Sequence, residues 1–252
     1  MILVYAYIFI VGTALGSFYN VVALRVSVRK SIVTPRSSCL SCGHVLTVLE
    51  LIPVLSYLML RGRCKQCGTK ISSIYPVFEL LTGLLLVLSV IVVGWSLEII
   101  IAWTLVSLFM IIVVSDLLYM LIPNSILLFF SGLFFFEKLF LPFNSWWDSV
   151  IGLTAGFGIL SLIAIVSRGG MGGGDIKLFA LLGFVLGWKI VMMSLILSLF
   201  FGSLFGVIGL LTGHVKKREP MPFGPYIMLG TLCAYFFGYE IMKFYSSFLL
   251  LS

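Results

Sequence analysis

Residues 99–124 read IIIAWTLVSLFMIIVVSDLLYMLIPN, an apolar run that ends at Asp116 and is followed by a second run that opens near Pro123. The first run, 99–115, carries no charge and approaches the length of about 20 residues that a helix needs to cross a bilayer. A carboxylate at the end of such a run is costly and usually functional. The stretch therefore predicts a membrane-spanning helix that carries a functional carboxylate at the membrane boundary.

The composition of the whole chain agrees with a membrane protein. Hydrophobic residues make up 61% and charged residues 10%, and the mean hydropathy is +1.22, which excludes a soluble globular domain. We predict an all-α polytopic membrane protein with about eight transmembrane helices and a small cytoplasmic four-cysteine loop. The predicted spans are 1–24, 75–93, 99–115, 121–140, 149–167, 176–190, 191–213 and 223–250, with the sixth and seventh poorly separated.

The basic residues predict the orientation of the chain. Eight of them lie between the first two spans: Arg25, Arg29, Lys30, Arg36, Arg61, Arg63, Lys65 and Lys70. Because cytoplasmic loops are enriched in Lys and Arg, this segment should be cytoplasmic and the N-terminus outside. Alternating the spans places 13 of the 16 basic residues inside, and both Asp116 and Asp175 at the cytoplasmic boundary. The net charge of +7 is then a topology signal and does not indicate nucleic-acid binding.

The polar segment 25–74 contains four of the five cysteines, arranged as Cys39-x2-Cys42 and Cys64-x2-Cys67. Paired C-x2-C units favour a tetrahedral Zn²⁺ site with four thiolate ligands, here with a spacer slightly longer than usual. Disulfides are disfavoured in a reducing cytoplasmic loop, although redox-active or merely structural thiols stay open. His44 could replace one ligand, but a surface imidazole is the simpler interpretation.

A second boundary carboxylate, Asp175, follows three glycines and opens another apolar run. Taken alone, it reads as a helix N-cap, and Asp116 as a solvated interfacial acid. Two such carboxylates on the same side favour a catalytic pair that shares a proton and activates water, with Gly172 and Gly174 allowing close approach. A competing hypothesis is a transporter in which the same aspartates bind a cation or relay protons.

Beyond these residues, the chain resembles the type IV prepilin peptidases, membrane aspartic proteases of the GxGD type, over nearly its whole length. The resemblance is carried by Gly16-Ser17-Phe18-Tyr19-Asn20-Val21-Val22, Arg25, the two C-x2-C units, Arg61-Gly62-Arg63, Ile71-Ser72, Tyr75-Pro76, Glu79, Thr82-Gly83, Asp116, Ile122-Pro123-Asn124, Gly172-Gly173-Gly174-Asp175-Ile176-Lys177-Leu178, Gly187-Trp188 and Pro222-Phe223-Gly224-Pro225. The ordered set, with the cysteine loop, is more specific than a lone GxGD.

The resemblance implies two activities at the cytoplasmic face of a bacterial inner or plasma membrane. Family members remove the short basic leader of prepilins and pseudopilins, and many then methylate the new N-terminus with S-adenosylmethionine. The first knuckle lacks the proline seen in many relatives, and Glu50-Leu51-Ile52-Pro53 lacks an asparagine. A peptidase without methyltransferase activity is therefore an alternative.

The predicted domain organisation follows the same pattern. A first transmembrane helix (1–24) precedes a cytoplasmic zinc-knuckle loop domain (25–74) and a membrane-embedded peptidase core (75–252). The implied partners are prepilin or pseudopilin substrates and membrane lipids, with no nucleic acid. The sequence does not indicate the oligomeric state, the location of an S-adenosylmethionine site, or whether the substrates serve pili, secretion or DNA uptake.

Overall fold

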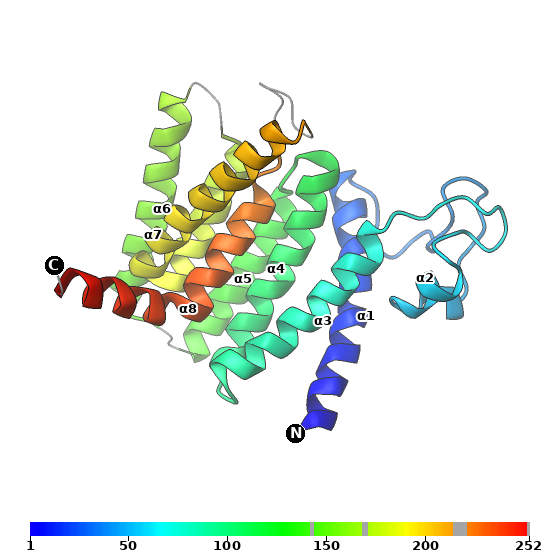
Figure 1. Cartoon of the computed structure of the whole chain (residues 1–252), viewed down its shortest axis with the longest axis horizontal. Coiled ribbons are helices and arrows are strands. Elements are labelled where there is room, and N and C mark those ends of the chain that lie inside the picture. The colour runs from blue at the N-terminus through cyan, green and yellow to red at the C-terminus, as the bar shows by residue number, and fades with distance from the viewer. Residues whose placement is uncertain (142–143, 168–170, 214–220, 251–252) are drawn as a thin grey trace. The chain divides into compact units, whose positions relative to one another are not determined.

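The computed structural model describes residues 1–141, 144–167, 171–213 and 221–250 and divides into two compact units, Met1–Ser115 and Asp116–Ser252. Its helices are α1 (Ile2–Ser27), α2 (Leu55–Met59), α3 (Ile74–Val93), α4 (Glu98–Tyr119), α5 (Asn124–Phe140), α6 (Trp146–Val166), α7 (Gly173–Leu211) and α8 (Gly224–Leu250), with a short 3₁₀ helix at Leu49–Leu51 (Figure 1). Arg168 and 216–218, which we predict to be inside, lie outside the described residues.

Among the described residues, six helices are long and apolar enough to cross a membrane: α1, α3, α4, α6, α7 and α8. The predicted span 121–140 corresponds to α5, which has 17 residues and is shorter than these six. The predicted spans 176–190 and 191–213 both fall within α7, which has 39 residues. Each predicted apolar run is thus helical, and the all-α membrane fold predicted from the sequence is confirmed.

In the first unit, α1 and α3 pack in antiparallel directions because small residues let their backbones approach closely. A Cβ atom on Gly12 would lie 2.7 Å from the Cα of Gly83, and one on Gly16 would lie 2.8 Å from the Cα of Glu79. One turn further along α1, Asn20 Nδ2 donates to the carbonyl of Tyr75 at 3.2 Å. This close pairing brings the polar side chains near the loop end of α1 against those of α3.

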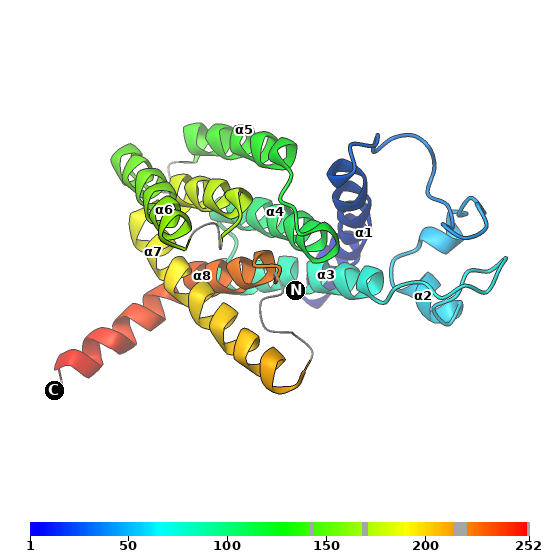
Figure 2. The ribbon, with the colours of Figure 1, turned by 90° about the horizontal axis from the view of Figure 1, so that it is seen from above.

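In the second unit, α7 packs against both α6 and α8, and its course is interrupted at Gly187 (Figures 1 and 2). Gly187 has φ 79° and ψ 174°, a conformation outside the helical region that glycine adopts without a Cβ clash. The two arms, 173–186 and 188–211, therefore run in different directions (Figure 2). The sequence predicted this division a few residues later, at 190/191, because apolar runs on both sides conceal a turn made by one glycine.

Polar groups surround the turn at Gly187. The backbone N–H of Trp188 donates to Asp148 Oδ1 at 3.4 Å, and Asn144 Nδ2 donates to the carbonyl of Val185 at 3.3 Å. Lys138 Nζ donates to the carbonyl of Asn144 at 3.1 Å. Because a turn inside a helix leaves backbone groups without helical partners, Asp148 and Asn144 supply partners for α7, and Lys138 holds Asn144.

Candidate active site

The two boundary carboxylates both belong to the second unit and interact electrostatically with each other. Asp116 lies in the last turn of α4 with 6% of its surface exposed, and Asp175 is the third residue of α7 with 9% exposed. Residues 59 positions apart in the sequence are thus brought together at the ends of two helices. Carboxyl groups that come into contact can share one proton, which is the arrangement that activates water in aspartic proteases.

The start of α8 holds Asp116 in place. The backbone N–H of Gly224 donates to Asp116 Oδ2 at 2.7 Å, and the N–H of Phe223 donates to the same carboxylate. A Cβ atom on Gly224 would lie 2.8 Å from that oxygen, so only glycine fits there without a shift. The sequence does not indicate this role, because the segment 222–225 reads as an ordinary proline-flanked turn more than 100 residues from Asp116.

The glycines before Asp175 have distinct surroundings. Gly172 donates its N–H to the Asp175 carboxylate, and a Cβ at this position would lie 3.1 Å from Asp175 Oδ2. A Cβ on Gly174 would lie 2.8 Å from the Cβ of Ile122, whereas one on Gly173 would meet nothing within 4 Å. Gly172 and Gly174 therefore permit close contacts beside the carboxylate, and Gly173 does not.

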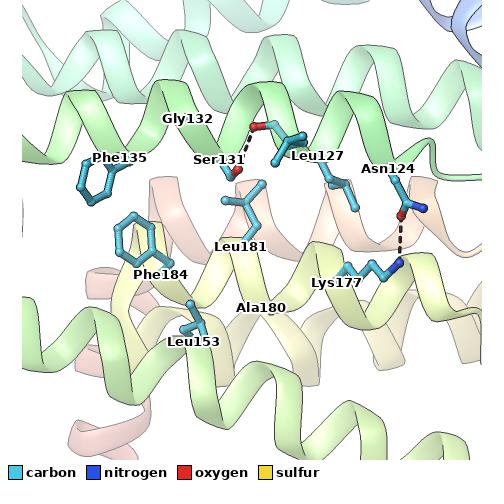
Figure 3. Close-up of a pocket in the computed structure, with 11 residues that line it drawn as sticks. Asn124, Leu127, Ser131, Gly132, Phe135, Leu153, Lys177, Ala180, Leu181 and Phe184 are labelled. Carbon is cyan, nitrogen blue, oxygen red and sulfur yellow. Dashed lines mark hydrogen bonds between the residues drawn. The ribbon is translucent and has the colours of Figure 1, made fainter.

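A groove of about 730 Å³ lies between α5, α6 and the first arm of α7, and neither aspartate lines it (Figure 3). At one end, Lys177 Nζ donates to Asn124 Oδ1 at 2.9 Å, which ties the first turn of α7 to the start of α5. The lining of the groove is mostly apolar and comprises Asn124, Leu127, Leu128, Ser131, Gly132, Phe135, Leu153, Lys177, Ala180, Leu181 and Phe184. Residues two apart on a helix point about 200° apart, so Lys177 faces the groove while Asp175 faces Asp116.

The four paired cysteines of the first unit form a compact cluster in which every sulfur lies within 4.8 Å of the others. The Sγ atoms of Cys39 and Cys67 are 3.8 Å apart, and those of Cys42 and Cys64 are 3.9 Å apart. A tetrahedral Zn²⁺ with Zn–S bonds of about 2.3 Å places its sulfurs about 3.8 Å from one another. The cluster therefore has the donor set and the spacing of a closed four-thiolate metal site.

The two C-x2-C units adopt the same local structure, which explains how they present their sulfurs. Gly43 and Gly68, with φ 72° and 69°, donate to the carbonyls of Cys39 and Cys64 respectively, each at 2.9 Å. A left-handed residue after the second cysteine closes each knuckle, a conformation that glycine adopts at little cost. Because the same turn occurs in both segments, the two C-x2-C units present their sulfurs in a symmetric arrangement.

His44 does not join the sulfur cluster. Its Nε2 lies 3.2 Å from both carboxylate oxygens of Glu50, whose Oε2 also accepts from the N–H and hydroxyl of Thr47, each at 2.8 Å. These hydrogen bonds from Thr47, with the contribution of His44, lower the pKa of Glu50 to about 2. Glu50 thus closes the loop beside the first knuckle, and its unit does not contain the aspartate pair.

Two protein-family models match successive parts of the chain. The model of the bacterial Peptidase A24 N-terminal domain matches residues 10–93, which include α1, the cysteine loop and α3. The model of the type IV leader peptidase family matches residues 103–207, which include Asp116 and Asp175.

Individual relatives agree with these matches. The chain is 45% identical over 238 residues to a prepilin leader peptidase/N-methyltransferase of Bacillus subtilis (strain 168), covering 94% of this chain and 96% of that protein. It is 34% identical over 281 residues to a protein of the same name from Aeromonas salmonicida (strain A449), covering 97% and 94% respectively. No solved structure shows a significant match. The family resemblance predicted from the motifs is confirmed, and the chain belongs to the type IV leader peptidase family.

Proposed function

We propose that this protein is a multi-pass membrane endopeptidase that removes the short leader of type IV prepilins or pseudopilins and then N-methylates the new N-terminus with S-adenosylmethionine. Family membership and the relatives' names support both activities. The observation that carries the peptidase assignment is the buried, interacting pair Asp116 and Asp175. The positive-inside pattern of the basic residues supports a cleavage site at the cytoplasmic face.

In the proposed mechanism, the carboxyl groups of Asp116 and Asp175 share one proton. The ionised carboxylate accepts a proton from a water molecule, whose oxygen attacks the scissile carbonyl carbon. The protonated partner donates a hydrogen bond to the carbonyl oxygen and later helps to protonate the leaving amine. The amides of Phe223 and Gly224 keep Asp116 oriented through the reaction.

The substrate gives a reason for a site at the membrane boundary. A prepilin has an apolar helix directly after its leader, so this helix can stay in the bilayer while the bond to be cut lies at the interface. Asp116 lies in the last turn of α4 and Asp175 is the third residue of α7, which supports a position for both where these helices meet the boundary. A catalytic pair at the membrane boundary can reach this bond while the substrate helix stays in the bilayer.

We also propose that the cluster of Cys39, Cys42, Cys64 and Cys67 holds a structural Zn²⁺. About 50 mostly polar residues bury too little apolar surface to fold alone, and a metal can supply the missing stability. When bound, the ion would cross-link the two knuckles, and it takes no part in the hydrolysis. The four-sulfur geometry supports this assignment.

Mass spectrometry tests the proposed function directly. The purified protein is incubated with a prepilin-like substrate in the presence and absence of S-adenosylmethionine, and we expect loss of the leader in both and one added methyl group only with the donor. Leader loss without methylation would leave the alternative of a peptidase that lacks methyltransferase activity. An intact substrate, under conditions in which the Bacillus subtilis relative cleaves it, would overturn the assignment and favour the transporter hypothesis, which predicts ion flux in proteoliposomes.

Alanine substitutions of the two glycines directly before Asp175 should differ in their effect on leader cleavage. Gly174→Ala should lower leader cleavage by about 10²-fold, because the new Cβ would lie 2.8 Å from Ile122 Cβ and displace the segment that carries Asp175. Gly173→Ala should keep nearly full activity, since its Cβ meets nothing within 4 Å. Initial cleavage rates of the two variants, with equal amounts of folded protein, make the measurement. Equal losses in both would show that backbone freedom, and not the contact with Ile122, is what matters.

A further inference from the structure

The first unit contains a buried carboxylate that the peptidase mechanism does not use. Glu79 lies in the second turn of α3, on the side of the cysteine loop, and only 8% of it is exposed. Its Oε2 accepts from the backbone N–H of Val54 at 2.8 Å, and its carboxylate accepts from the Ser17 hydroxyl. Its contacts in the described residues are these two hydrogen bonds, and it forms no ion pair there with a Lys, Arg or His. Burying a carboxylate without a nearby cation is energetically unfavourable, so a functional reason for Glu79 is expected.

A second buried group beside Glu79 is incompletely satisfied. Asn20, 3% exposed, donates through Nδ2 to the carbonyl of Tyr75, one helical turn before Glu79. Its Oδ1 is buried and has no hydrogen-bond donor within the described structure. Ser17 and Asn20, three residues apart, lie on the same face of α1, and Gly16 brings that face against the backbone of Glu79. The two acceptors therefore belong to one small region between α1 and α3.

The loop residue that donates to Glu79 has a strained backbone conformation. Val54, whose N–H contacts Glu79, has φ 61° and ψ −52°, a conformation that β-branched residues rarely adopt. Such strain persists where the surrounding structure enforces it, and it is concentrated at functional sites. Here the strained residue donates its N–H to a buried carboxylate.

These observations have a common chemical implication. A carboxylate without a counter-charge and a carbonyl oxygen without a donor are both satisfied by one cationic donor, and a primary ammonium group supplies a positive charge and three N–H donors. We propose that Asn20 and Glu79 form a binding site for an α-ammonium group that serves methyl transfer. This inference rests on the proposed methyltransferase function. The ammonium has two possible sources, the amino-acid part of the methyl donor and the freed N-terminus of the cleaved substrate.

The test uses binding to the full chain in lipid nanodiscs, measured by calorimetry. S-adenosylhomocysteine carries the α-ammonium group, whereas methylthioadenosine lacks the amino-acid part. A peptide that begins with the substrate's new N-terminus is compared with its N-acetylated form. The parent protein should bind the ammonium-bearing member of at least one pair more tightly, and the pair that shows the difference identifies the source.

Glu79→Gln keeps an acceptor for Val54 N–H and removes the charge, so the fold is retained while affinity for the ammonium-bearing probe should fall about 10- to 100-fold. Asn20→Leu removes the oxygen that has no donor and should also lower the affinity for the same probe. Thr82→Val is the matched control, because buried Thr82 bonds only the carbonyl of Phe78 in its own helix, and its affinities should match those of the parent.

The outcomes separate this site from the proposed function. If the parent binds neither ammonium-bearing probe, or if Glu79→Gln and Asn20→Leu bind as the parent does, the site is wrong and Glu79 serves only to anchor Val54. Leader removal by the same parent preparation is measured by mass spectrometry in parallel. Leader removal together with unchanged binding in the variants would overturn the ammonium site alone, whereas an uncleaved substrate would overturn the proposed function itself.

Discussion

Asp116→Asn and Asp175→Asn should each lower the rate of leader cleavage by on the order of 10⁴-fold or more, as loss of one member of a catalytic unit commonly does. An amide has nearly the same size as a carboxyl group, so burial and packing change little. It can neither accept the proton from water nor return it to the leaving amine. Because the carboxyls act as a unit, the double variant should be hardly slower than either single variant.

The measurement is the initial rate of leader loss by mass spectrometry, with thermal unfolding in detergent to show that each variant is folded. Glu240→Gln is the matched control, since Glu240 is an exposed acid in the same unit and its neutralisation should leave the rate unchanged. A substantial residual rate in Asp175→Asn, with folding intact, would mean that this carboxylate has a structural role and that Asp116 acts with another group.

Removing the proposed Zn²⁺ should unfold the cysteine loop. Structural Zn²⁺ in small peptides contributes an apparent binding free energy of about 10–16 kcal/mol at neutral pH, which far exceeds what such a loop can supply by packing. Cys64→Ser, at the one buried position of the four, should abolish stoichiometric metal binding. It should also expose the knuckle amides of Gly43 and Gly68 to hydrogen exchange, because their bonds to Cys39 and Cys64 depend on the closed turns.

Metal content by mass spectrometry and hydrogen exchange over the loop provide the readouts. Cys233→Ser is the control, since Cys233 lies in α8 in the other unit and should leave both zinc content and exchange unchanged. Full zinc occupancy in Cys64→Ser would show that another ligand set holds the ion. A metal-free parent protein with the four thiols reduced and the loop protected from exchange would show that the thiols need no metal.

Much of the fold follows from the sequence because the bilayer imposes simple rules. Long apolar runs must be helical to satisfy their backbone hydrogen bonds, so the runs and their approximate ends could be read directly. The cysteine pairs could be assigned to one cluster because the spacing of C-x2-C units is set by tetrahedral metal geometry. Asp116 and Asp175 could be singled out because carboxylates are rare in such runs.

The sequence does not reveal which segments far apart in the chain are in contact. The amides of Phe223 and Gly224 reach Asp116 only because α8 begins beside the end of α4, and no local pattern encodes that approach. Likewise, the link between Val54 and Glu79 depends on how the loop folds back over α3. Hydropathy identifies spans but is insensitive to one glycine, so the turn at Gly187 could be located only to within a few residues.

That turn has a mechanical consequence for the surrounding lipid. The first arm of α7, 173–186, is about 21 Å long and α5 is about 26 Å long, whereas the hydrocarbon core of a bilayer is about 30 Å thick. Hydrophobic mismatch of this kind is relieved by thinning of the nearby leaflets, at a cost of fractions of a kcal/mol per Å. The membrane should therefore be thinnest beside this arm, which carries Asp175 in its first turn, and the path by which water reaches a bond held at the end of a lipid-embedded helix is shorter there.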